Sequence, residues 1–281
     1  MDESIPRKSA MDSQSEPEAG AASAVPPVKP ATSGGPLELD VDRSRFLRKL
    51  FLVLICMESA CVLGDIFLNY SEWIDISAIE RIFNMTREDS IANFLASGQM
   101  LLVSMTVLLL YAVIRQTDTG SWHKLSFMLM GLFFFYMAFD DGAKLHERLA
   151  TGIKKLAEDS ALFEAYPSYP WQVIFGPLFG AGALLLLYMF FRGLSNRTSR
   201  KLLLLGLALW VVAVSLDVLE GIPKYGPEGW LEFLSDGYAY PVRHFQKITE
   251  EFLEMVGTSC IFIAFLRELM TVAPDLRFRF R

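Results

Sequence analysis

Acidic side chains and histidines interrupt three apolar regions of this sequence, at spacings that allow them to do chemistry together. The stretch FDDGAKLHERL (139–149) closes the apolar run LSFMLMGLFFFYMAF, and SLDVLEG (215–221) and HFQKITEEFLEM (244–255) repeat the pattern. His244 and Glu251 are seven residues apart, which on a helix puts both side chains on one face. Three segments that are distant in the sequence therefore offer carboxylates and imidazoles that can converge.

Carboxylates and imidazoles together are the ligands of di-iron and di-manganese sites and of zinc sites with mixed ligands. The sequence predicts a divalent metal (iron, manganese or zinc) bound by Asp140, His146, Glu147, Asp217, Glu220, His244, Glu251 and Glu254. The Glu-x-x-His pattern of soluble di-iron bundles is absent, because Ala143 precedes His146 by three and Pro241 precedes His244 by three. A metal here would activate water for hydrolysis or dioxygen for oxidation.

Further charged residues near these ligands have expected roles of their own. Glu58 and Asp65 share a face of the first apolar segment, with Glu58 near its middle, and are candidates for an intramembrane relay. A plainer interpretation remains open, in which ion pairs such as Asp140–Lys144 brace a solvated helix end. The residues expected to act in catalysis, through proton transfer or as partners of the metal ligands, are Asp141, Glu250, Lys144 and Lys247.

Membrane-spanning helices must position all of these groups, because the apolar runs reach the roughly 18 residues that can cross a bilayer. We expect an all-α, polytopic integral membrane protein whose transmembrane domain occupies residues 43–272. The six helices of its bundle are predicted at about 46–69, 89–115, 121–145, 169–192, 200–221 and 242–270.

Local patterns refine the expected helices. The residues from Thr86 to Asp89 resemble a capping box for the second helix, and the third is expected to continue beyond the membrane to about residue 157. The Gly176–Gly180 spacing favours close helix packing in the fourth. The apolar residues of 76–83 predict a short helix lying on the membrane interface.

The two ends of the chain differ from the helical domain. Residues 1–42 are rich in Pro, Ser, Ala, Gly and Glu, so we expect a disordered cytoplasmic tail, and residues 273–281 form a basic cytoplasmic tail. Lys and Arg gather on the short connections and tails of one side, which predicts both termini inside an inner (plasma) membrane. The acids then lie in the outer half of the bilayer.

Charged groups facing lipid would cost about 2.5–3.5 kcal/mol each at a helix centre, so these acids must face one another, water or cations. The leading hypothesis is a metal-dependent membrane enzyme, a hydrolase or oxidoreductase, acting on a lipid or other amphipathic substrate. One alternative is a proton- or cation-coupled transporter or channel that uses the acids as a relay. Another is a non-catalytic assembly or partner protein. Membrane lipids are the expected partners, and the negative net charge of −6 argues against nucleic acid.

Overall fold

The computed structural model describes residues 42–71, 73–87, 89–145, 148–149, 152–153, 170–221 and 236–274, and every regular element within these ranges is helical. The helices are α1 (Arg43–Gly64), its π-helical continuation η1 (Asp65–Tyr70), α2 (Ser77–Phe83), α3 (Ile91–Ile114), α4 (Ser121–Ala143), α7 (Pro170–Tyr188), the π-helical η2 (Met189–Gly193), α8 (Arg197–Gly221) and α10 (Asp236–Val272). The predicted tails, 1–42 and 273–281, lie almost wholly outside the described residues.

Six helical segments of the described chain are long and apolar enough to cross a membrane: Arg43–Tyr70, Ile91–Ile114, Ser121–Ala143, Ile174–Gly193, Arg197–Val218 and Pro241–Val272. Each coincides with one of the six predicted helices, so the all-α, multi-pass fold class is confirmed. The short predicted helix is also present, as α2.

The caps follow local side-chain chemistry, and one prediction about them was wrong. Asp42 caps α1 by accepting the backbone N–H of Arg45 at 3.0 Å. Helix α3 is capped by Ser90, whose Oγ accepts the N–H of Asn93 at 3.2 Å. Thr86, the predicted cap, instead donates its N–H and hydroxyl to Asn84 in the preceding turn. Ser90 directly precedes the helix, so its hydroxyl is better placed than that of Thr86 to accept a free N–H of the first turn.

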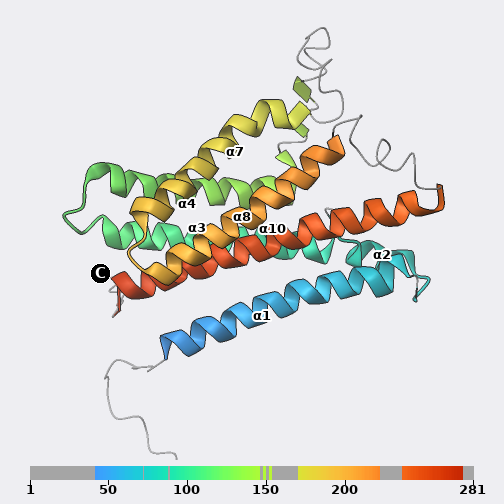
Figure 1. Cartoon of the computed structure of the whole chain (residues 1–281), viewed down its shortest axis with the longest axis horizontal. Coiled ribbons are helices and arrows are strands. Elements are labelled where there is room, and N and C mark those ends of the chain that lie inside the picture. The colour runs from blue at the N-terminus through green and yellow to red at the C-terminus, as the bar shows by residue number, and fades with distance from the viewer. Residues whose placement is uncertain are drawn as a thin grey trace, which may run out of the picture. The chain divides into compact units, whose positions relative to one another are not determined.

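Helix α10 is the element on which most of the others pack. It lies between α1 and α8 and also contacts α3, which in turn packs on α4 (Figure 1). Hydrogen bonds join the C-terminal end of α1 to the start of α10, and the start of α3 to the C-terminal end of α4. We call this end of the bundle, together with the C-terminal end of α8, the acidic end.

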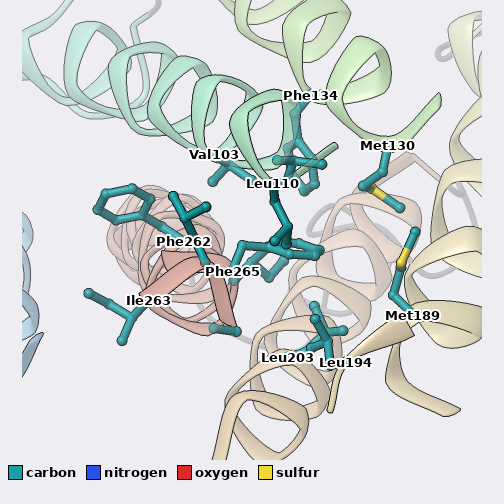
Figure 2. Close-up of a cluster of buried hydrophobic side chains, with 14 of the residues drawn as sticks. Val103, Leu110, Met130, Phe134, Met189, Leu194, Leu203, Phe262, Ile263 and Phe265 are labelled. Carbon is teal, nitrogen blue, oxygen red and sulfur yellow. The ribbon is translucent and has the colours of Figure 1, made fainter. Parts of the chain in front are cut away.

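The larger hydrophobic core fills the half of the bundle opposite the acidic end. It combines the second half of α3, the first half of α4 and the last turns of α10, with Leu110, Phe134 and Phe265 all fully buried (Figure 2). A smaller apolar cluster near the acidic end includes Cys61 and Met255. The division separates the polar groups of the acidic end from the main apolar core.

Close approach of two helices occurs at a different glycine pair from the predicted one. An added Cβ at Gly206 of α8 would lie 2.6 Å from the carbonyl oxygen of Gly257 in α10, whereas Gly176 and Gly180 have open space around them. Glycine therefore lets the backbones of α8 and α10 meet. This contact holds together the two helices that carry most of the acids.

Helix α4 ends earlier than expected. Lys144 adopts a left-handed conformation (φ 53°, ψ 43°) and its N–H bonds the carbonyl of Asp140, which ends α4 at Ala143. The chain therefore does not continue as one uninterrupted helix, because a left-handed residue turns it off the helix axis, although the described residues 145, 148–149 and 152–153 beyond this turn are helical. Asp140 and Asp141 therefore occupy the last turn of α4.

Candidate functional site

Lys247 of α10 sits among carboxylates from its own helix and from α8. Its Nζ donates to Glu250 Oε1 at 2.5 Å and lies 3.6 Å from Glu251 Oε1 and 4.0 Å from Asp217 Oδ1. Glu250 is 3% exposed and the Lys247 side chain 29%, so the shortest of these ion pairs is half-buried. The spacing of three and four residues on α10 brings the ammonium and both glutamates to one side of the helix.

Two more acids extend this group. Asp141, from the last turn of α4, accepts the hydroxyl of Ser97 of α3 at 2.6 Å, and its charge acts on both Glu251 and Glu254. Glu254 also interacts electrostatically with Glu250 and Glu251. We call these residues together the acidic cluster: Asp141, Asp217, Lys247, Glu250, Glu251 and Glu254.

The acidic cluster holds more acid than base among the side chains that the structure describes. Three carboxylates, from Asp217, Glu250 and Glu251, lie within 4.0 Å of the Lys247 ammonium, and Glu250 Oε2 is buried without a hydrogen-bond partner in the described chain. Buried carboxylate oxygens are costly unless a proton, a donor or a cation compensates them. The arrangement is thus chemically suited to binding something positive.

His244, a predicted metal ligand, lies seven residues before Glu251 on α10, but its partner is Asp65 at the C-terminal end of α1. Its Nε2 is 2.7 Å from Asp65 Oδ1, and Tyr70 stacks on the imidazole with a ring-centre distance of 5.1 Å. Asp65 also accepts the N–H of Met85 at 2.6 Å and a longer contact of 3.4 Å from Asn69. Both partners of the pair are buried, and every oxygen of Asp65 has a donor.

Glu58 forms a third buried polar group. Its Oε1 accepts hydrogen bonds from Gln99 of α3 at 2.6 Å and from Ser259 of α10 at 2.5 Å. All three side chains are buried, while Glu58 Oε2 and Gln99 Oε1 have no partner in the described chain. Glu58 and Asp65 therefore have separate partners, and both tie α1 to α10.

The remaining predicted residues lie at the edge of the described chain or beyond it. Asp140 is buried and accepts the hydroxyl of Tyr136 at 3.2 Å, and Lys144 forms the left-handed end of α4. The positions of His146 and Glu147 and the side chain of Glu220 lie outside the described residues. Within the described residues, no three His, Cys, Asp or Glu side chains are arranged to hold a metal ion.

Three polar partners were not predicted from the sequence: Ser97, Gln99 and Ser259. They lie on apolar helices and donate hydrogen bonds to the carboxylates of Asp141 and Glu58. A signal was present, since a glutamine or serine inside a membrane span usually faces the bundle interior. Glu268, at the far end of α10, was also missed. It accepts the N–H groups of Ser195 and Asn196 at 2.7 and 3.1 Å and so fixes the loop before α8.

One family model matches residues 50–268, and its description is "Domain of unknown function (DUF8692)". The chain belongs to this family. The matched region includes part or all of each of the six membrane-spanning helices and the whole acidic cluster. No curated protein and no solved structure matches the chain. Membership assigns no activity, so a function has to be inferred from the acidic cluster.

Proposed function

We propose that the protein is a metal-dependent membrane enzyme, a hydrolase or oxidoreductase, whose site is the acidic cluster and whose substrate is a lipid or another amphipathic molecule. The observation that carries the proposal is the excess of carboxylates around Lys247, including the unpartnered, buried Glu250 Oε2. Because a buried carboxylate oxygen without a partner is costly in a low-dielectric site, a bound cation is the simplest compensation for Glu250 Oε2.

The chemistry of the neighbouring residues favours a transition metal as that cation. In the sequence, His146 and Glu147 follow Asp141 by five and six residues, so an imidazole and a further carboxylate are available close to it along the chain. Such mixed ligands suit iron, manganese or zinc. The metal would supply Lewis acidity or dioxygen activation, and Lys247 and the remaining carboxylates would orient the substrate and transfer protons.

The distribution of polar groups supports a site that works from one side of the membrane. On α10, the segment from Cys260 to Leu266 is entirely apolar, and its buried residues belong to the larger core. At about 1.5 Å per residue this is roughly 10 Å of helix without an acid, histidine or lysine. A proton relay along α10 would need polar groups in this segment, whereas an enzyme open to one side of the membrane would not.

Metal content tests the proposal directly. Protein purified without chelators should carry iron, manganese or zinc in stoichiometric amount, and the Glu251→Gln/Glu254→Gln double variant should lose it. Glu58→Gln is the matched control, because it makes the same chemical change at a buried carboxyl outside the acidic cluster. Equal metal content in all three proteins, or none in the wild type, would contradict the proposal.

The transporter alternative is favoured by one observation, the buried Glu58–Gln99–Ser259 group, which extends polar contacts from the acidic end toward mid-membrane. Reconstitution into liposomes with a pH gradient separates the two functions. A proton or cation flux that is lost in Glu58→Gln would support transport, and the enzyme proposal expects no flux from any of the variants. If Glu254→Gln leaves the cellular phenotype unchanged, the protein acts as a non-catalytic partner.

A further inference from the structure

An apolar groove lies between α8 and α10, beside the acidic cluster. Its volume is about 450 Å³, within the roughly 300–1,000 Å³ typical of small-molecule sites. Val242 and Phe245 in its wall are 42% and 40% exposed, so the groove opens on the surface of the bundle. The lining residues are Leu216, Pro241, Val242, Phe245, Gln246 and Thr249.

The groove and the acidic cluster occupy neighbouring faces of the same two helix segments. Each of three lining residues is followed in the sequence by a cluster residue: Leu216 by Asp217, Gln246 by Lys247, and Thr249 by Glu250. Consecutive residues on a helix point about 100° apart, so a molecule in the groove lies one helix face away from the carboxylates. Gln246 Nε2 also donates to the carbonyl of Leu216 at 3.3 Å and joins the two helices at this point.

The surroundings of the groove determine what can fill it. Its residues belong to the membrane-spanning segments Arg197–Val218 and Pro241–Val272, where the medium is hydrocarbon. The wall is mostly aliphatic and aromatic, and Pro241 adds no backbone N–H that a polar ligand would need. A flexible hydrocarbon chain matches this lining, whereas water or a peptide would leave polar groups unpaired.

We infer that the groove binds one acyl chain of a membrane lipid and so places that lipid's headgroup beside the acidic cluster. Calling this lipid the substrate rests on the proposed function, while its binding in the groove rests only on the geometry. The groove explains how a site made of carboxylates selects an amphipathic molecule, because the chain is bound on one helix face and the reacting headgroup on the next.

Photo-crosslinking locates the bound chain. A bilayer lipid with a photoreactive group near the end of its acyl chain is incorporated into liposomes with the full-length protein, and the labelled peptides are sequenced. Labelling should concentrate on residues 241–249 of α10 and around Leu216 of α8. Labelling spread evenly over the lipid-facing residues of all helices, Phe94 and Leu184 included, would overturn the inference.

Filling the groove tests the same inference by loss of binding. In the Leu216→Trp/Val242→Trp variant the indole rings occupy the groove, and native mass spectrometry should show at least a ~10-fold lower affinity for one retained lipid, equivalent to about 1.4 kcal/mol. Val211→Trp/Val214→Trp is the control, since both residues are exposed on α8 and point away from Leu216. Equal lipid retention in the two variants would contradict the assignment.

Metal analysis of the same proteins separates this inference from the proposed function. The groove-filled variant should keep its metal and lose the lipid, and Glu251→Gln/Glu254→Gln should lose its metal and keep the lipid. A wild type that retains the lipid but contains no metal would refute the proposed enzyme and leave the acyl-chain site standing. A wild type that contains metal but retains no lipid would refute the acyl-chain site and leave the proposed enzyme standing.

Discussion

Where helix α10 faces α1, its His244 pairs with Asp65, an acid whose two oxygens both accept hydrogen bonds. On its α8-facing side, it carries acids that outnumber their base. Asp65 is paired with His244, and the N–H of Met85 occupies its other oxygen. In the acidic cluster, by contrast, three carboxylates lie within 4.0 Å of Lys247 Nζ, and Glu250 Oε2 has no partner in the described chain.

This difference indicates that the acids packed on two sides of α10 have different roles, one structural and the other in ligand binding. A buried acid with matched partners fixes the position of a helix, and its removal leaves uncompensated groups behind. An acid that lacks a matched partner raises the free energy of the folded protein until a ligand compensates it, which is typical of binding sites. The predictions below test this division between a structural pair and a ligand-binding cluster.

The largest effect is expected at the structural pair. Asp65→Ala removes the buried carboxylate that pairs with His244 and accepts the N–H of Met85, and should lower the free energy of unfolding by about 3–5 kcal/mol. Denaturant unfolding in detergent micelles measures this, with Asp75→Ala, an exposed acid, as control. In a double-mutant cycle with His244→Ala the losses should be clearly less than additive, and full additivity would rule out the pairing.

The stability of the acidic cluster should fall more on loss of its base than on loss of one acid. Lys247→Met removes the central positive charge and should destabilise the metal-free protein by about 1–3 kcal/mol. Glu251→Gln removes one of the excess acids and should stay within about 1 kcal/mol of wild type. Thermal unfolding of chelator-treated protein compares the two, and a larger loss for Glu251→Gln would show that its carboxylate is structural.

The close contact between Gly206 of α8 and Gly257 of α10 should set the distance between the cluster residues on these two helices. Gly206→Ala places a methyl group against the Gly257 carbonyl and Ile261, and should cost about 1–3 kcal/mol by forcing the helices apart. Gly176→Ala is the matched control, because its added methyl meets open space. A melting temperature unchanged by Gly206→Ala would mean that α8 and α10 can separate freely, and with them Asp217 and Lys247.

The smallest effect is expected at an exposed acid with two bases, outside the membrane spans. Hydrogen bonds from Arg81 and Arg87 lower the pKa of Asp89 from 3.8 to about 2. Because the folded pKa lies below the unfolded one, the stabilisation is present above about pH 4 and is lost as the pH falls toward 2. Asp89→Asn should flatten the pH dependence of unfolding in this window, and added salt should weaken it in the wild type. If Asp89→Asn has the same pH profile as the wild type, the ion pairs of Asp89 do not contribute to stability.

Much of the fold followed from the sequence, because apolar length alone specifies a membrane span. All six predicted helices are present, and the short helix at residues 77–83 was also anticipated. The local ends were harder. Ser90 rather than Thr86 caps α3, and Lys144 turns the chain at the end of α4, since both outcomes depend on competition between neighbouring residues for the same backbone groups.

The candidate site was anticipated in its composition more than in its pairing. Lys247, Glu250, Glu251 and Glu254 were all named as site residues from the sequence, and helical spacing alone brings them to one side of α10. His244 shares that helix, yet its partner is Asp65 of α1, which no helical periodicity could reveal. Residues 146 and 147 remain predicted ligands outside the described chain.

The sequence by itself determined that acids would be withdrawn from lipid, because the cost of exposing a charge to hydrocarbon holds for any arrangement of the helices. Only the tertiary structure decided which acids share a base and which do not. That outcome depends on how α1, α4, α8 and α10 are rotated against one another, and the rotation is set by contacts such as Gly206 on Gly257, whose effect appears only when two distant segments meet.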